Sequence, residues 1–496
     1  MHVSSKYLDL TRKKLELTRL PRELELPKRR WDLGTPKAVL EPLLDYWLES
    51  YDWRIEEAGL NTSLPQYRTT ISLPSPHNTD SVQKLRIHFV HKRSTHENAI
   101  PLLFCHSWPS SFIEPQKVID ALTDPQSLPN FGDGAQQAFH VVVPSIPGFG
   151  FSDASTIETF GLEGTAEAFD KVMKRLGYER YVAHGSGWGF SICRTLALNY
   201  PQRCVAVHTA NPTFAEPTFK QSPISFLKYQ LAKVTRARVA SLSFGYVPWE
   251  VQDASSQDAS SHQDHQSTNI YRGPVGPTLS RLYSLRPQTV AFSLCDSPVG
   301  LLAGLLDVIH TPAPPSLEPI TSRSRSPFLS PIELEQEESH QDRSSIETAF
   351  RSTPAGLVER VINSRESEVD SKYYSWSATE VLNWTMMQWL PGPEASLRWL
   401  RRAHLDSTPS SPFSTMHCPV PLGISSFRAR NPSKNEKATP LMWGSATWNV
   451  AWVKRHQRLA SLPAWEARDE LVLDMRKYFQ SHAPAMHAPS SNANAT

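Results

Sequence analysis

The stretch with the clearest chemical potential runs from Tyr181 to Ile192, where a short apolar strand ends in closely spaced glycines and a helix follows. A turn of this kind lifts one side chain above the end of a sheet, and it needs residues with almost no side chain two positions before and two positions after. Gly185 and Gly189 have that spacing, so a nucleophile would stand at position 187. Glycine occupies this position, and the turn therefore presents no reactive group.

Three nearby or relocated groups could supply chemistry instead. Ser186 is the alternative nucleophile, because serine activated by histidine is a common hydrolytic pair. The residues two positions away from it, His184 and Trp188, are too large for the turn, so we expect Ser186 to point sideways. His456 lies in a run of basic residues, which we interpret first as a solvated turn and second as the place of a base. His184 either lines a pocket or forms a hydrogen bond at the strand end.

Buried strands and helices are predicted on both sides of this turn. Continuous apolar runs such as Ile100 to Cys105 are typical of parallel strands that are covered on both faces. Strands that alternate with helices indicate an α/β fold with a mostly parallel sheet flanked by helices. Besides the strand of the turn, strands are expected at 66–73, 84–91, 100–105, 139–143, 204–210 and 418–425, and helices at 162–176 and 471–480.

The chain divides into five predicted parts. These are an N-terminal extension with helices at 1–95, a first core segment at 96–214, a helical lid at 215–410, a second core segment at 411–482 and a disordered tail at 483–496. The lid is inserted between strands of the sheet. It contains two stretches without periodicity, near 252–268 and 311–351, which we interpret as disordered.

The composition restricts the class of partner. The 496 residues include 51 basic and 49 acidic side chains, so no net charge favours nucleic acid or an anionic membrane surface. The five scattered cysteines have no metal-ligand spacing, and we expect buried free thiols, no metal site and a reducing compartment. The N-terminus has no apolar run of signal-peptide or membrane-spanning length, so a cytoplasmic protein without a transmembrane segment is predicted.

Motifs along almost the whole chain resemble those of the microsomal-type epoxide hydrolase family, in the branch common among fungi, within the α/β-hydrolase superfamily. The matching stretches are Leu17 to Pro21, Tyr51 to Arg54, His106 to Pro109, Pro144 to Ser152, Arg286 to Thr289 and Asp296 to Leu302. So many matches in order make the resemblance specific. It implies an α/β-hydrolase fold with a lid, no metal or organic cofactor, and a hydrophobic epoxide as substrate.

The resemblance also implies a mechanism whose residues are substituted here. In the family an aspartate on the turn opens the epoxide to an alkyl-enzyme ester, and a histidine oriented by an acid activates the water that hydrolyses this ester. These three positions fall on Gly187, Ser461 and Arg430, none of which can perform the family's step. The sequence does not place a substitute acid, for which Asp370 and Glu436 remain open.

The resemblance also implies which residues line the substrate pocket. The two lid tyrosines of the family, which donate hydrogen bonds to the epoxide oxygen, fall on Leu279 and Leu400. Tyr283 lies four residues after Leu279 and would share its face of a helix, so it is a displaced candidate. The predicted substrate-binding residues are His106, Trp108, Pro109, Trp188, His184, Leu279, Tyr283 and Leu400.

We therefore predict an epoxide-hydrolase-like protein that acts on a hydrophobic epoxide or a related oxygenated small molecule, in fungal secondary metabolism or detoxification. Serine-based hydrolysis at Ser186, or direct addition of water, would replace the ester route. The alternative is a catalytically inactive protein of the same fold that binds a small molecule or a partner. A polar group facing the pocket near Gly187 would favour the enzyme. The oligomeric state, including a homodimer, is left open.

Overall fold

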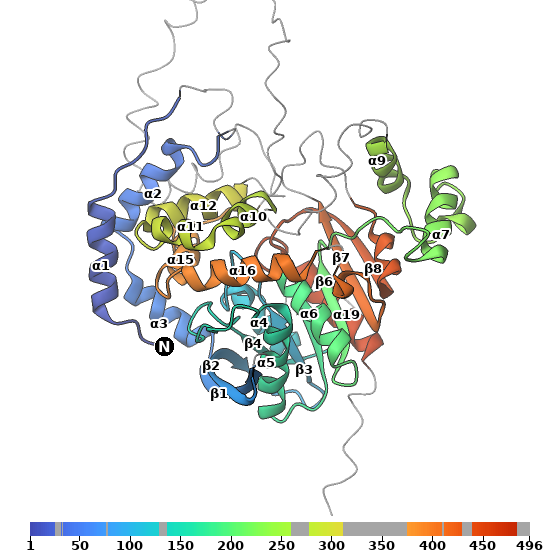
Figure 1. Ribbon diagram of the computed structural model, residues 1–496, viewed down its shortest axis with the longest axis horizontal. Helices are drawn as coiled ribbons and strands as arrows, with labels where there is room; N and C mark the ends of the chain where they lie inside the picture. The colour runs from blue at the N-terminus through green and yellow to red at the C-terminus, as the bar shows by residue number, and fades with distance from the viewer. Residues whose placement is uncertain are drawn as a thin grey trace, which may run out of the picture.

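The computed structural model describes residues 1–24, 31, 33–75, 78–127, 136–258, 277–310, 374–408, 411–428 and 439–483. Over these residues eight strands form one sheet, in the order β1-β2-β4-β3-β5-β6-β7-β8 (Figure 1). The strands are β1 (Gln66–Ser75), β2 (Asn78–Lys92), β3 (Ile100–Cys105), β4 (Phe139–Pro144), β5 (Tyr181–Gly185), β6 (Cys204–Ala210), β7 (Cys418–Arg428) and β8 (Trp448–Leu459). The pairs β1·β2 and β2·β4 are antiparallel, and all the others are parallel. The predicted mostly parallel sheet is confirmed.

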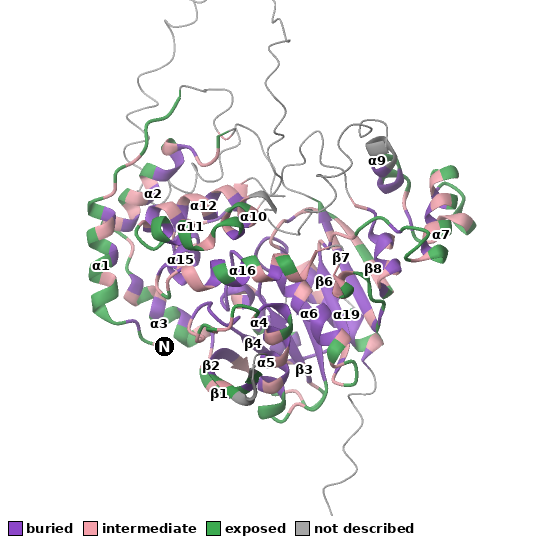
Figure 2. Cartoon of the chain, in the orientation of Figure 1, coloured by how far each residue is buried: buried purple, intermediate pink, exposed green. Residues whose placement is uncertain are grey.

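Helices cover both faces of the sheet, and the central strands are buried between them (Figure 2). Those that flank or close the core are α4 (Ile119–Thr123), α5 (Leu162–Arg175), α6 (Trp188–Asn199), α17 (Pro412–Thr415), α18 (Pro463–Glu466) and α19 (Arg468–His482). Four of the five cysteines are buried and Cys295 is exposed, and all five are free thiols. The buried thiols lie in strands or a helix of the core, as their apolar surroundings in the sequence predicted.

Strand β8 was not predicted, because it carries the run Lys454 to Arg458 and is only half-buried. An edge strand that pairs on one side lacks the continuous apolar run of a central strand. The interpretation of His456 as part of a solvated turn is therefore wrong. It lies within β8, and its imidazole stacks on the ring of Phe427, with the ring centroids 4.5 Å apart.

The helices between β6 and β7 form two groups. The first consists of α7 (Pro223–Val234), α8 (Ala240–Ser243) and α9 (Pro248–Asp258), and it lies beside β7 and β8 (Figure 1). The second consists of α10 (Pro277–Leu285), α11 (Pro287–Leu294), α12 (Pro298–His310), α15 (Ala378–Trp389) and α16 (Glu394–Asp406). The stretch near 252–268 that was predicted to be disordered begins inside α9, so its first part is helical. The rest of it, the stretch 311–351 and nearly all of the predicted tail lie outside the described residues.

The N-terminal helices pack on the second group. They are α1 (Ser5–Glu16), α2 (Lys37–Glu49) and α3 (Trp53–Ser63). The indole N–H of Trp389 donates to the hydroxyl of Thr11 at 2.8 Å, and the Tyr51 hydroxyl donates to Oδ1 of Asn383 at 2.7 Å. The ring of Trp31 stacks on His310, with centroids 3.5 Å apart. These contacts attach the N-terminal segment to the helices that lie beyond the sheet.

No single helix within the described ranges is long and apolar enough to cross a membrane. Helices α11 and α12 meet that test only when they are taken together, and they are bent by 114° relative to each other. Most of the apolar side chains of α12 are buried within the protein.

Candidate functional site

The predicted turn joins β5 to α6, and glycines shape it. A Cβ atom on Gly185 would lie 2.5 Å from the carbonyl carbon of Gly189, and one on Gly189 would lie 2.0 Å from the carbonyl oxygen of Cys105. Both contacts are with backbone atoms, so a side chain at either position would displace the strand ends. Gly187 at the apex has a φ of 57° and a ψ of −128°. The backbone thus has the strained shape that presents a nucleophile, and no side chain is attached to it.

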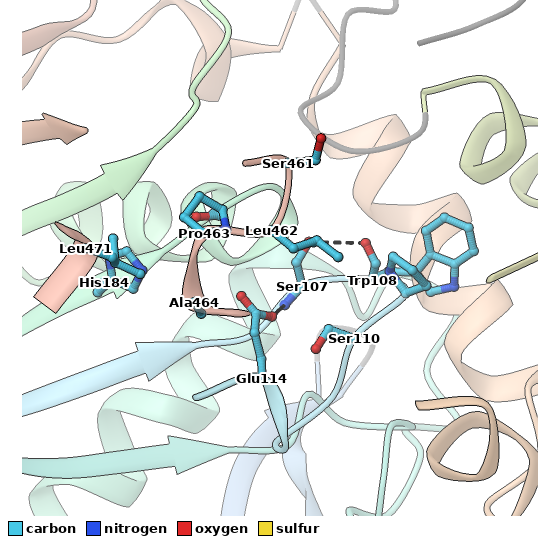
Figure 3. Close-up of a pocket in the computed structure, with 12 residues that line it drawn as sticks. Ser107, Trp108, Ser110, Glu114, His184, Ser461, Leu462, Pro463, Ala464 and Leu471 are labelled. Atoms are coloured by element: carbon cyan, nitrogen blue, oxygen red, sulfur yellow. Dashed lines mark hydrogen bonds between the residues drawn. The ribbon is translucent and has the colours of Figure 1, made fainter. Parts of the chain in front are cut away.

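A small cavity lies beside this turn (Figure 3). Its walls come from the loop after β3, the end of β5 and the segment that follows β8. The lining residues are Ser107, Trp108, Pro109, Ser110, Glu114, His184, Ser186, Ser461, Leu462, Pro463, Ala464 and Leu471. The free space is about 20 Å³, which is room for a water molecule and far less than a drug-sized ligand needs. Of the predicted site residues, five line this cavity, namely Trp108, Pro109, His184, Ser186 and Ser461.

The hydroxyl group of Ser107 binds a backbone N–H group at the apex of the turn. Its Oγ accepts a hydrogen bond of 2.9 Å from the backbone N–H of Trp188, the residue after the apex. In α/β-hydrolases this N–H is one of the donors that stabilise a developing oxyanion. The backbone N–H of Ser107 in turn donates to Oε2 of Glu114 at 2.9 Å. Both N–H groups are therefore satisfied within the chain.

Glu114 is a buried carboxyl group on the cavity wall. Its carboxyl group points toward Ser107 and the cavity (Figure 3). Burial raises the pKa of Glu114 to about 7, although hydrogen bonds from Ser107 and Ser110 favour the charged form. A carboxyl group with a pKa near neutrality can donate or accept a proton at physiological pH. Glu114 was not predicted as a site residue, because a single acid after a strand has no partner at a recognisable spacing in the sequence.

His184 brings an imidazole ring to the same cavity. It is 1% exposed, and its Nδ1 lies 3.0 Å from Nδ1 of His208 on β6. Burial lowers the pKa of His184 well below its usual value and that of His208 to about 4. Both rings are therefore neutral at physiological pH. The two alternatives left open for His184 are both realised, since it lines the cavity and forms a hydrogen bond.

The segment after β8 is held in place by Glu466. Its Oε2 accepts hydrogen bonds from the backbone N–H groups of Ser461, at 2.6 Å, and Leu462, at 2.9 Å. Its Oε1 accepts from the indole N–H of Trp376 at 3.1 Å. This clamp places Ser461 on the cavity wall, where a histidine of the family would be expected. Leu462 and Pro463 fill the space beside it.

The predicted lid positions lie outside the cavity wall. Leu279 and Tyr283 share a face of α10, as predicted, because both approach Gly304 of α12. The ring of Tyr283 also packs edge-on against Trp108, with centroids 6.1 Å apart, and burial raises its pKa to about 12. Leu400 is fully buried in α16. None of these three lines the cavity, and the hydroxyl of Tyr283 faces a helix.

Two further predicted residues have structural contacts. His106 accepts a hydrogen bond at Nε2 from the N–H of Ile146 at 3.0 Å, so it holds the loop after β4. It does not line the cavity. The indole ring of Trp188 packs against His404, with centroids 4.7 Å apart, and lies outside the cavity wall as well. The predicted acid position Arg430, together with Asp370 and Glu436, lies outside the described residues.

His456 is paired with an acid, but away from the cavity. Its Nε2 lies 2.6 Å from Oδ2 of Asp474 on α19, a carboxylate that is fully buried. Lys454 donates to Oδ1 of the same carboxylate at 2.8 Å. These hydrogen bonds lower the pKa of Asp474 against the opposing effect of burial. The sequence held a signal for this site, because Asp474 interrupts the apolar face of the closing helix.

Two family models match the chain. "Epoxide hydrolase N terminus" matches residues 1–115, and "alpha/beta hydrolase fold" matches residues 100–247. Among curated proteins, a "Putative epoxide hydrolase" of Stigmatella aurantiaca is 35% identical over 61% of this chain and 58% of its own length. Epoxide hydrolase 1 of Oryctolagus cuniculus is 30% identical over 58% of this chain and 56% of its own length. These matches support an epoxide hydrolase family within the α/β-hydrolase superfamily.

Solved structures of epoxide hydrolases share the fold. The Aspergillus niger epoxide hydrolase superposes with a TM-score of 0.61 at 20% identity, covering 97% of this chain and 95% of that one. The juvenile hormone epoxide hydrolase of Bombyx mori has a TM-score of 0.59 at 18% identity, covering 98% and 93%. The chain matches little more than half the length of its curated relatives in sequence. The α/β-hydrolase fold predicted from the sequence is thus confirmed.

Proposed function

We propose that this epoxide hydrolase family member acts on a hydrophobic epoxide or a related oxygenated small molecule by direct addition of water, without an ester intermediate. One observation carries this proposal. Glu114, a buried carboxyl group with a pKa near 7, faces a water-sized cavity beside a turn whose apex is Gly187. Position 187 therefore has no carboxylate that could attack an epoxide carbon, whereas Glu114 provides a carboxyl group that can transfer a proton.

The proposed reaction needs one acid and one base. Protonated Glu114 donates its proton to the epoxide oxygen as the C–O bond breaks. The water oxygen attacks the carbon, and its proton passes to the neutral ring of His184, so that a vicinal diol leaves. Glu114 thus replaces the lid tyrosines of the family as the proton donor to the epoxide oxygen. Leu279 and Leu400, at the positions of those tyrosines, have no hydrogen-bond donor in their side chains. Groups whose environments move their pKa values apart are suited to such paired roles.

The substrate needs more space than the cavity has in this conformation. The walls beside the apex are the loop of Trp108 and Pro109 and the segment of Leu462 and Pro463. We propose that the helical insert at 215–410 acts as the lid and that one of these walls moves when a substrate enters. The buried free thiols support the further proposal of a reducing, cytoplasmic location.

Single-turnover hydrolysis of styrene-type epoxides in ¹⁸O-labelled water tests the mechanism. Direct addition places the solvent label in the diol of the first turnover, whereas an ester route delivers an unlabelled oxygen from the protein. We expect labelled diol from the unmodified chain and a loss of at least about 100-fold for Glu114→Gln. Ser186→Ala is the matched control and should keep the rate. Its inactivity would instead identify Ser186 as a nucleophile.

The second candidate function is non-catalytic binding, and a specific contact favours it. The hydroxyl of Ser107 already occupies the N–H of Trp188, so the apex is closed to an oxyanion. A protein of this kind would give no diol with any epoxide offered and would keep that behaviour in Glu114→Gln. This outcome would overturn the enzymatic proposal.

A further inference from the structure

A chain of buried polar side chains crosses the sheet from the cavity to α19. Nδ1 of His184 on β5 lies 3.0 Å from Nδ1 of His208 on β6, and Nε2 of His208 lies 3.1 Å from Oγ of Ser425 on β7. Oγ of Ser425 lies 2.6 Å from Oδ2 of Asp474 on α19. None of the four side chains is more than 1% exposed. A buried polar group without a hydrogen-bond partner destabilises the folded protein, so each of these contacts must join one donor to one acceptor.

The carboxylate at one end sets the direction of every hydrogen bond in the chain. An ionised carboxylate only accepts, so the single hydroxyl proton of Ser425 goes to Asp474. Ser425 can then only accept from His208, which must carry its proton on Nε2. A neutral ring carries one proton, so Nδ1 of His208 accepts, and His184 must be protonated on Nδ1. Nε2 of His184 is left as a bare lone pair.

We infer that Asp474, through Ser425 and His208, fixes the tautomer of His184 that directs a proton-accepting nitrogen to the cavity, where it binds the O–H group of water or of an alcohol. His184 lines that cavity, and its ring contacts the side chain of His208 through Nδ1, which leaves Nε2 as the nitrogen on the other side of the ring. The free space of about 20 Å³ is sufficient for one water molecule. Asp474, Ser425 and His208 are therefore positioning residues for a base.

The surroundings of the chain keep this direction in place. His208 is packed among the rings of Trp452, Tyr478 and Phe479, so its neutral form is favoured. The titratable groups that donate hydrogen bonds to Asp474 are Lys454 and His456, both on β8. Both favour its ionised, accepting state. His184 itself packs against the ring of Phe104.

The inference extends the proposed function, because it assigns the base of that reaction, but its test does not depend on turnover. Nuclear magnetic resonance of protein labelled with ¹⁵N-histidine distinguishes protonated from bare ring nitrogens. The signals are assigned with His184→Gln and His208→Gln. We expect His184 to carry its proton on Nδ1 and His208 on Nε2. A proton on Nε2 of His184 in the unmodified protein would overturn the inference.

Removal of one link should reverse the tautomer. In Ser425→Ala, Nε2 of His208 has no acceptor, and a buried N–H without a partner is more costly than a bare lone pair. The proton of His208 should therefore move to Nδ1 and that of His184 to Nε2. Ser425→Thr keeps the hydroxyl and should restore the original pattern.

Lys454→Met is the matched control. It removes a hydrogen-bond partner of Asp474 that does not belong to the series His184, His208, Ser425 and Asp474, and it should leave the tautomer of His184 unchanged. An unchanged His184 in Ser425→Ala, with its fold verified by near-UV circular dichroism, would also overturn the inference. If the tautomers are as expected but no epoxide is hydrolysed, the proposed function fails and the inference stands.

Discussion

The hydroxyl oxygen of Ser107 lies 2.9 Å from the backbone nitrogen of Trp188, and this contact occupies the donor next to the apex of the turn. Together with Gly187, it is the basis of our proposal that two elements of ester chemistry are missing. One is the atom that attacks, and the other is a donor that stabilises the oxyanion formed when the ester is hydrolysed. Because the turn keeps its shape, the proposal can be tested by restoring a nucleophile at position 187 and by freeing the N–H group of Trp188.

Gly187→Asp should form a covalent adduct with a styrene-type epoxide, because the backbone still presents position 187 as an apex. The adduct should accumulate, since no base stands at Ser461, and the mass of the intact protein would reveal it. Ser107→Gly in the same background frees the N–H of Trp188 and should speed loss of the adduct by about 100-fold. Gly187→Asn is the control, and an adduct there would point to attack elsewhere.

Two glycines of the turn, Gly185 and Gly187, should differ from each other and from Gly59 of α3 in their tolerance of alanine. Gly185→Ala brings a Cβ atom to 2.5 Å from backbone and should lose more than about 3 kcal/mol or fail to fold. Gly187→Ala places a side chain on a residue with a φ of 57° and should lose about 1 to 3 kcal/mol through backbone strain. Gly59→Ala, in a helix with open space around its Cβ, should gain up to about 1 kcal/mol. Urea unfolding would rank them, and equal losses at Gly185 and Gly59 would contradict the geometry.

Glu114 should make the protein less stable as the pH rises. Its pKa is about 7 in the folded state against 4.5 for the free group. The folded state thus binds more protons between these values, and stability falls from about pH 4.5 to about pH 7. Glu114→Gln removes this pH-dependent contribution to the free energy of unfolding. The free energy of unfolding of the variant, relative to that of the unmodified protein, should therefore rise by about 3 kcal/mol between about pH 4 and about pH 8. Urea unfolding at both pH values measures this, and a parallel pH dependence in the two proteins would contradict it.

Asp474→Asn should destabilise the protein, because it weakens the hydrogen bonds from Lys454 and His456 at a fully buried position. The lost hydrogen bonds of the buried carboxylate should cost about 1 to 3 kcal/mol, less than for a fully buried ion pair, because the Lys454 side chain is 46% exposed and can be solvated. The exposed helical pair of Arg12 and Glu16 provides the control, and Glu16→Gln should change stability by less than about 0.5 kcal/mol. Chemical denaturation compares the two, and equal small effects would show that the buried network is not needed for the fold.

Local patterns in the sequence were sufficient for much of the fold. The apolar run of β3, the alternation of β2 and the glycine spacing around position 187 depend on a residue and its near neighbours. Such patterns survive in the sequence because each side chain of a strand or turn has its environment set by its position in that element. The edge strand β8 escaped prediction because it is bordered by a strand on one side only, and Lys454 to Arg458 then resemble a solvated run.

The sequence by itself determined the α/β-hydrolase fold, the resemblance to epoxide hydrolases and the glycine at position 187 of the turn. Only the tertiary structure decided what surrounds that position. It placed Glu114 beside Ser107, seven residues earlier, and joined His184 to Asp474 across four elements that are distant in the chain. The physical reason is that burial and hydrogen-bond partners depend on which strands become neighbours. The pKa of Glu114 and the proton of His184 are set by those neighbours, and their spacing in the chain does not encode them.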